Sequence, residues 1–228
     1  MNALDLPQLD EEDLKRVALF PLPNAVLFPS TMLPLHIFEP RYRAMTREAI
    51  EEQLPIVICK FVEPRILNAH QQPLFCEIGG VGFIRNYQQL PDGRYNILVE
   101  GVSRVRVTKE IFDTGKLYRV GHAELIAEQS DTSGALGALL TTLRRCITGL
   151  ETEYTTLSHA LQKILKEVQT PAALSDTIAS LIISNPEMRQ HMLEEPRVER
   201  RLDELITRIA ALLNASEGSA PQKDPWLN

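Results

Sequence analysis

Short apolar segments that alternate with polar residues dominate the first 129 positions of the chain. In RYNILVE (94–100) every second residue is apolar, and in SRVRVTK (103–109) two valines oppose two arginines. This period of two is typical of β-strands that bury one face. Strands are expected at 16–20, 25–28, 32–38, 55–61, 75–90, 94–101, 103–112 and 117–128.

Five prolines interrupt the apolar stretch 18–45, where neither a long helix nor a central strand would tolerate them. Pro21, Pro23 and Pro29 fit strand ends and corners, and Pro34 fits an edge position or bulge. Pro40 is suited to the first turn of a helix that runs to about residue 53. Glu39 is then expected at the N-cap, with its carboxylate near the positive end of the helix.

The segment LPDGRY (90–95) has the composition of a tight turn, because proline, aspartate and glycine each favour turn conformations. It should join the strand that ends near Leu90 to the strand that starts at Arg94. Three glycines in EIGGVGF (77–83) fall inside a strand pattern, where glycine usually marks a bulge or a sharp curl. A curled sheet of this kind predicts a closed or nearly closed barrel.

After residue 130 the apolar residues recur with a helical period. Helices are expected around 136–150, 154–168 and 174–182, and a fourth is expected to begin at Pro196 and carry apolar residues to 213. The predicted fold class is α+β: an acidic arm at 1–14, a small β-barrel subdomain at 15–129 with an inserted helix at 40–53, and a helical bundle subdomain at 130–214. Residues 215–228, which include Trp226, have linker composition and are predicted to be disordered.

Composition and charge narrow the class of protein. The 228 residues are 44% hydrophobic and 24% charged, enough for a real core, and the formal net charge of −6 argues against bulk attraction to nucleic acid or anionic membrane. The acidic N-terminal segment resembles no targeting peptide, and no apolar run is long enough to cross a bilayer. Three widely spaced cysteines suit a reducing compartment. The predicted location is the cytoplasm, without membrane association.

Four segments together resemble a known family: FPLPNAVLFPSTMLPLHIFEPRYRAM (20–45), PDGRYNILVEGVSRVRV (91–107), LSDTIASLI (174–182) and RQHMLEEPRVERRLDELITRIAALL (189–213). They resemble the N-terminal, substrate-binding domain of the ATP-dependent Lon protease, in the free-standing form found as short bacterial proteins. The resemblance covers roughly residues 15–213. It implies a small PUA-like β-barrel with one inserted helix, followed by a helical subdomain.

The sequence shows no motif for nucleotide binding or for metal-dependent catalysis. The chain has no GxxxxGK[ST] loop to hold nucleotide phosphates, and it ends too early for the ATPase and protease modules of a full-length Lon. Its five histidines show no metal-ligand spacing. We expect a non-catalytic protein with no catalytic residues, no metal and no cofactor.

The resemblance implies substrate recognition, that is, binding of unfolded or tagged polypeptide segments. The candidate peptide-binding residues lie beside the inserted helix: Phe38, Glu39, Arg41, Tyr42 and Met45. Apolar side chains would bury against an extended peptide while the rim charges orient it. The alternative is that Phe38, Tyr42 and Met45 are core residues between helix and barrel, with Glu39 as a cap.

RNA binding is the second hypothesis, because PUA-like barrels often bind RNA. Between residues 81 and 122 there are seven basic residues against four acidic ones. Alternation would place Arg104 and Arg106 on one outward face, with Tyr87 and Tyr95 nearby for base stacking. An ordinary exposed sheet face shows a similar excess. As a third possibility, the protein is an adaptor whose partner is a protease or chaperone machine.

Overall fold

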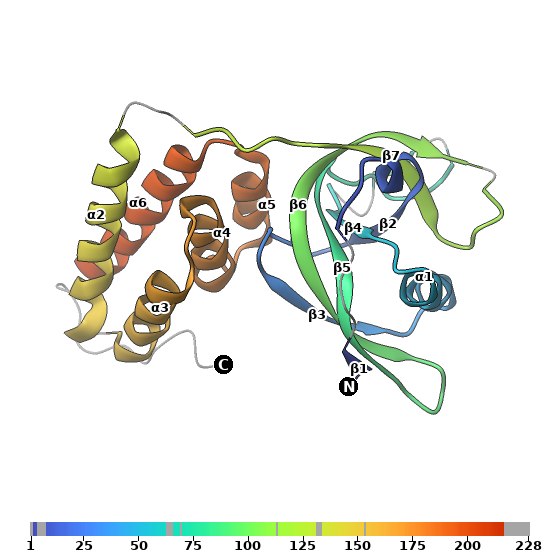
Figure 1. The fold of residues 1–228 in the computed structure, drawn as a ribbon, viewed down its shortest axis with the longest axis horizontal. Helices are drawn as coiled ribbons and strands as arrows, with labels where there is room; N and C mark the ends of the chain where they lie inside the picture. Colours follow the sequence, from blue (N-terminus) through green and yellow to red (C-terminus); the bar gives the residue numbers. More distant parts are fainter. Residues whose placement is uncertain are drawn as a thin grey trace. The chain divides into compact units, whose positions relative to one another are not determined.

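The computed structural model describes residues 2–3, 8–62, 66–68, 70–112, 114–130, 134–152 and 154–216. The chain forms two compact units (Figure 1). The sheet unit comprises Met1–Ala127 and Ile183–Glu194, and the helical unit comprises Glu128–Ile182 and Glu195–Asn228. Trp226, most of the predicted tail and Asp113 lie outside the described residues.

The sheet unit contains one seven-stranded sheet in the order β1-β5-β4-β2-β7-β6-β3. Its strands are β1 (Asn2–Ala3), β2 (Val17–Leu22), β3 (Met32–Ile37), β4 (Ile56–Lys60), β5 (Ile78–Gln89), β6 (Tyr95–Ile111) and β7 (Arg119–Leu125). An additional pairing between β5 and β6 closes β5, β4, β2, β7 and β6 into a barrel. The β2–β4 pair is parallel, and the other pairs are antiparallel. The α+β fold class with a barrel-like sheet is therefore confirmed.

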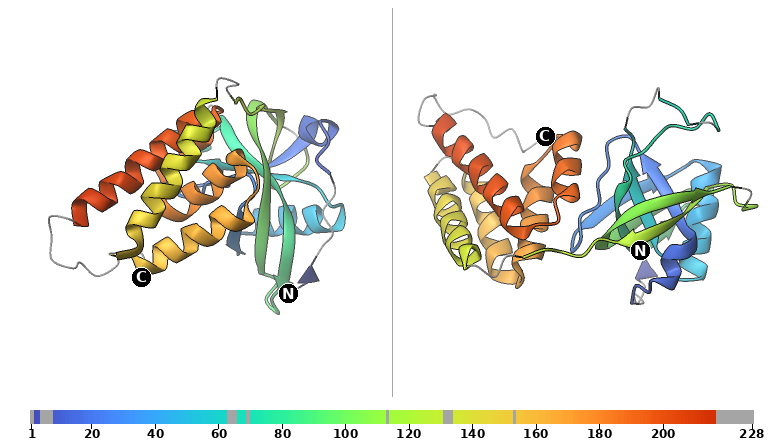
Figure 2. Two further views of the ribbon diagram at one scale, coloured as in Figure 1. Left: turned by 60° about the vertical axis from the view of Figure 1, so that its left-hand side comes forward. Right: turned by 90° about the horizontal axis from the view of Figure 1, so that it is seen from above.

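Two strands were predicted at 94–101 and 103–112, but the structure has one continuous strand of 17 residues there, β6. It pairs with β3 over Tyr95–Glu100, with β7 over Val105–Ile111, and with β5 along much of its length, so the two strands form a long curved hairpin (Figure 2). The predicted turn is present, because Leu90 N donates to Arg94 O at 2.8 Å and Gly93 has φ +80°. The register shifts at Val81/Gly82, where a bulge was expected.

The strand predicted at 25–28 is wrong, because this segment is a buried loop. The loop crosses the sheet so closely that a Cβ at Gly80 would lie 1.9 Å from Leu27 O, and one at Gly101 would lie 2.1 Å from Phe28 O. These two glycines give the loop room to bury Leu27 and Phe28. The loop thus packs against the sheet without pairing with it.

α1 (Pro40–Glu51) begins with Pro40 in its first turn and ends within two residues of the predicted position. Pro34, as expected, lies in an edge strand, β3. Glu39 is the N-cap residue but makes no side-chain capping bond. The buried face of α1 joins one of two apolar clusters of the sheet unit, and the other cluster includes Leu14 from the end of the acidic arm.

A helix missed by the sequence interpretation, α5 (Pro186–Glu194), belongs to the sheet unit although it follows the predicted boundary at residue 130. Three side chains fasten it to the strands. Arg104 Nε donates to Leu193 O at 3.0 Å, Gln190 Nε2 donates to Ile78 O at 2.9 Å, and Lys60 Nζ lies 2.7 Å from Glu187 Oε1. The Arg104 bond holds the helix by its main chain, at Leu193 O, whereas the Gln190 bond joins a helix side chain to the main chain of β5.

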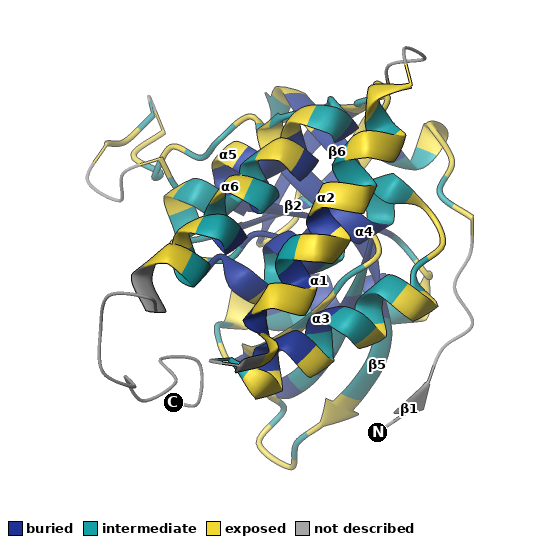
Figure 3. Cartoon of the chain, turned by 90° about the vertical axis from the view of Figure 1, so that its left-hand side faces the viewer, coloured by how far each residue is buried: buried dark blue, intermediate teal, exposed yellow. Residues whose placement is uncertain are grey.

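The helical unit contains α2 (Ala135–Gly149), the short 3₁₀ helix η2 (Leu150–Thr152), α3 (Thr155–Glu167), α4 (Pro171–Ile182) and α6 (Val198–Ser216). α2 and α3 show exposed positions on one side and buried positions on the other (Figure 3). α6 begins at Val198, two residues after the predicted start at Pro196. The buried Arg201 side chain donates to Ser175 Oγ and Glu128 Oε1, both at 3.0 Å, and lies 3.6 Å from Asp176 Oδ1.

Candidate functional site

The five candidate peptide-binding residues at the start of α1 differ in exposure. Phe38 is 61% exposed, whereas Tyr42 and Met45 are buried in the core. Arg41 Nη2 pairs with Glu39 Oε2 at 2.8 Å, and the Arg41 guanidinium stacks 4.4 Å from the centre of the Tyr42 ring. The stretch thus combines the exposed Phe38 ring and the Arg41–Glu39 ion pair with two side chains, Tyr42 and Met45, that are buried.

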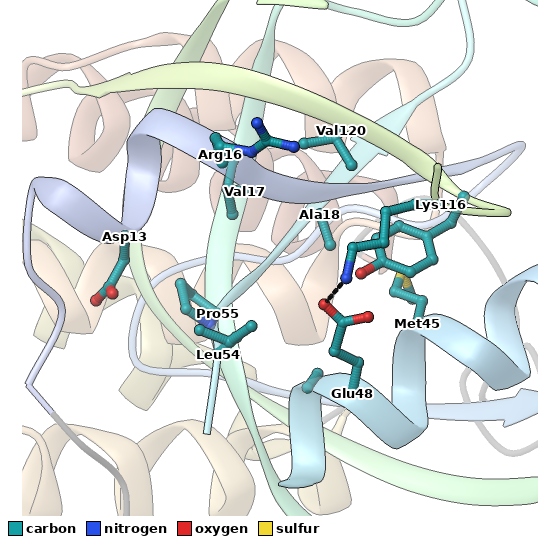
Figure 4. A pocket seen from close by; sticks show the side chains of 12 residues that line it. Asp13, Arg16, Val17, Ala18, Met45, Glu48, Leu54, Pro55, Lys116 and Val120 are labelled. Atoms are coloured by element: carbon teal, nitrogen blue, oxygen red, sulfur yellow. Dashed lines mark hydrogen bonds and ion pairs between the residues drawn. The ribbon is translucent and has the colours of Figure 1, made fainter. Parts of the chain in front are cut away.

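Two hollows of the sheet unit lie along α1. The first has a volume of about 310 Å³ and lies between α1, β2 and β7 (Figure 4). Its apolar lining is Val17, Ala18, Met45, Ala49, Leu54, Pro55 and Val120, and its polar lining is Asp13, Arg16, Glu48, Lys116 and Tyr118. A space of this size suits one or two apolar side chains better than a large cofactor.

The second hollow has a volume of about 280 Å³ and lies beside the start of α1 and the β6–β7 connection. Its lining includes the candidates Arg41 and Tyr42, together with Gln72, Glu110, Ile111, Phe112, Thr114, Gly115, Lys116, Leu117, Tyr118 and Arg119. Arg119 is held in place by Glu110, with N–O distances of 2.6 and 2.8 Å, and it also donates to Pro73 O at 2.8 Å. Candidate residues of α1 therefore border both hollows, since Met45 lines the first.

Lys116 and Tyr118 line both hollows. Lys116 Nζ reaches across to donate to Glu48 Oε1, and Figure 4 shows this ion pair at one end of the first hollow. The Lys116 ammonium lowers the pKa of Glu48, and the nearby Tyr118 hydroxyl lowers it further. Burial, and then the neighbouring Glu48 carboxylate, raise the pKa of Tyr118.

Exposed apolar side chains surround the second hollow. Leu117 is 72% exposed and Phe112 is 40% exposed, and both line it. The His70 ring stacks on Phe112, with centroids 3.7 Å apart, and the nearby chain exposes Ile66 and Leu67 as well. Apolar side chains gathered at a hollow are typical of a surface that binds another apolar molecule.

The sequence interpretation missed Glu48, Phe112, Lys116, Leu117 and Tyr118. Glu48 does have a local signal, because it follows Arg41 and Met45 at helical spacing on α1. Its partner Lys116 is 68 positions away, and no periodicity in the chain links the two. Only the fold brings them together.

The RNA hypothesis loses part of its basis in the structure. Arg104 does not face outward as expected, because it is 1% exposed and bonded to Leu193 O under α5. Tyr95 is buried in the core, so its ring is not free for stacking, and Tyr87 is partly buried against the same core cluster. Arg106 is exposed, as expected, and lies 3.2 Å from Glu77. The alternation failed because α5, remote in sequence, covers β6 at Arg104.

The described residues contain no cluster of three side chains arranged to hold a metal ion. In that same part of the chain, every helix is too short or too polar to cross a membrane.

Comparisons with known proteins agree with the resemblance noted in the sequence. A family model described as the ATP-dependent protease La (LON) substrate-binding domain matches residues 16–211. The Lon protease of Paraburkholderia phytofirmans is 28% identical over 196 residues, which are 84% of this chain and 24% of that protein. The Lon protease of Azospirillum brasilense is 27% identical over 202 residues, again 84% of this chain and 24% of the relative. The chain thus spans about a quarter of the length of these curated relatives.

Solved structures show the same fold. The N-terminal domain of Mycobacterium avium complex Lon protease matches with a TM-score of 0.66 at 18% identity, covering 86% of this chain and 98% of that one. The Lon N-terminal domain protein from Xanthomonas campestris matches with a TM-score of 0.59 at 20% identity, covering 85% and 98%.

Proposed function

Because the chain belongs to the family of ATP-dependent protease La (Lon) substrate-binding domains, we propose that it binds apolar segments of unfolded or tagged polypeptides beside α1. The observation that supports this most directly is the pair of hollows, with Leu117 and Phe112 exposed next to them. Burial of such side chains against a client releases water from apolar surface on both partners.

The proposed binding surface includes the five candidates of the sequence interpretation in different ways. Phe38 and Arg41 offer an exposed ring and a charge, whereas Tyr42 and Met45 form the walls of the hollows. Glu39 orients Arg41 through their ion pair. In this proposal the buried pair shapes the site and the exposed residues contact the client.

We propose further that the matched region acts by binding alone, without ATPase or protease chemistry of its own. The family match is to the substrate-binding domain, and it extends over residues 16–211. Such a domain would present clients to a protease or chaperone machine as an adaptor, or withhold them from it.

The test is fluorescence anisotropy with a labelled, permanently unfolded polypeptide, such as reduced and carboxymethylated lactalbumin. Leu117→Glu places a charge in the apolar surface, and we expect it to weaken binding about tenfold, since one buried leucine is worth about 1.5 kcal/mol or more. Leu117 is 72% exposed, so the variant should unfold at the same temperature as the wild type. Val102→Glu is the matched control, because Val102 is also exposed but lines neither hollow.

A single-stranded RNA probe serves as the second arm, with both probes measured at low and high salt. Apolar capture should persist at high salt, whereas phosphate-driven binding should fall steeply. Polypeptide binding that is equally strong in Leu117→Glu would contradict the proposed location. Salt-sensitive RNA binding without polypeptide binding would contradict the function itself.

A further inference from the structure

The Glu48 carboxylate is part of the proposed binding surface, where it lines the first hollow. Its side chain is 23% exposed, and Met45 and Ala49 of the same helix line this hollow with it. It accepts a hydrogen bond from Lys116 Nζ, which supplies the cation that pairs with it.

The Lys116 ammonium that pairs with Glu48 is loosely held. The Lys116 side chain is 37% exposed, and ion pairs of this exposure contribute little net stability. Lys116 follows Gly115, which has φ +73° and open space around it, since a Cβ there would meet nothing within 4 Å. Next along the chain, Leu117 is largely exposed. This turn is packed loosely enough for the lysine side chain to leave Glu48 at small cost.

Departure of the Lys116 side chain from Glu48 would free space in both hollows, because this residue lines both of them. The first hollow would then offer the apolar side chains of Met45, Ala49 and Val120 beside one unpaired carboxylate. An extended polypeptide with apolar residues flanking a lysine or arginine matches that pattern. A neutral or acidic residue at the same place would leave the carboxylate without a cation.

We propose that Glu48 selects a cationic side chain in the bound polypeptide, and that Lys116 occupies the place of that side chain when no client is bound. The inference rests on the proposed function and specifies its substrate class. Lys116 is in this sense an internal competitor. Its ammonium makes the same ion pair that a client ammonium would make.

The experiment uses two fluorescein-labelled peptides of alternating leucine and serine, one with a central lysine and one with acetyl-lysine at that position. Acetylation removes the charge and keeps the aliphatic stem of the side chain. Both peptides are titrated into the full chain and into Glu48→Gln and Lys116→Met variants. Glu51→Gln and Lys109→Met are matched controls, because both residues are exposed on the same elements or next to them and line neither hollow.

We expect the wild type to prefer the lysine peptide by up to about fivefold, the range of a partly exposed ion pair. Glu48→Gln should abolish this preference while its affinity for the acetyl-lysine peptide is unchanged. Lys116→Met should raise affinity for the lysine peptide more than for the other, since the competitor is gone. Circular dichroism melts establish that the variants are folded.

Equal affinity of the wild type for the two peptides, or a preference that survives Glu48→Gln, would overturn this inference and leave the proposed function standing. No binding of either peptide would overturn both. Apolar binding that depends on Leu117 but ignores the central charge would therefore separate the two proposals.

Discussion

The sheet unit and the helical unit differ in how many large apolar side chains they expose, although both bury charged ones. Among the described residues with large, exposed apolar side chains, all but Leu181 belong to the sheet unit. Both units bury charged side chains, namely Arg201 with Asp176 in the helical unit and Lys60 and Arg104 in the sheet unit. One unit therefore resembles a binding surface, and the other resembles a self-contained scaffold.

The two units also differ in how closely other atoms pack against their glycines. In the sheet unit Gly80 lies under the backbone of another segment, whereas in the helical unit Gly137 has open space at the position of a Cβ. Glycine is needed for close packing in the first case and has no such role in the second. Substitutions can therefore affect the two units with opposite signs.

The largest expected effect concerns the buried charges of the helical unit. Arg201→Ala leaves Asp176, which is 1% exposed, without its ion pair, and we expect the free energy of unfolding to fall by about 3–5 kcal/mol. Urea denaturation followed by circular dichroism measures this change. Arg200→Ala is the control, because the Arg200 side chain is 65% exposed. A loss below about 1 kcal/mol for Arg201→Ala, the range of surface pairs, would mean that the buried pair does not stabilise the unit.

The two glycines give the next prediction, with opposite signs. Gly80→Ala forces apart the sheet and the 25–28 loop, and a cost of about 1–3 kcal/mol is typical of such overpacking. Gly137→Ala in α2 should instead stabilise by about 0.5–1 kcal/mol, because alanine is the better helix former. Thermal melts of the two variants in parallel test this contrast. Equal shifts of the same sign would refute it.

The smallest effect is the response to acid. The Lys116 hydrogen bond lowers the pKa of Glu48, and the Arg197 hydrogen bond lowers the pKa of Glu195 in the helical unit. A lowered pKa means that the unfolded chain takes up protons first, so the stability from each pair is present above the ordinary value of 4.5 and lost as the pH falls below it.

Because the Glu48 pair is partly exposed, we expect its share of this loss to be at most about 1 kcal/mol. Urea unfolding at pH 7 and at pH 4 measures the loss, and Glu48→Gln and Glu195→Gln should each reduce it. A stability that does not change between the two pH values would contradict the assignment.

Local patterns predicted the parts of the fold that local forces determine. The alternation at 95–99, the turn at 91–93 and Pro40 at the start of α1 depend on neighbouring residues, and each was found as expected. The apolar period also located α2, α3 and α4 closely.

What the patterns could not predict depends on segments far apart in the chain. The 25–28 loop looks like a strand, and only its passage over Gly80 and Gly101 explains its burial. Arg104 looks like a surface residue until α5 covers it. The candidate site was half predicted, because α1 was recognised but the Lys116 side of the hollows was not.

The attachment of α5 has a consequence for the order in which the chain can complete its structure. Lys60, Ile78 and Arg104 meet their partners only at residues 187–193, after α2, α3 and α4 have been synthesised. In a nascent chain these three groups therefore lack their α5 partners while more than fifty further residues of helical sequence emerge from the ribosome. In a fragment that ends at residue 129, the buried Lys60 and Arg104 of the barrel would permanently lack the partners that α5 supplies.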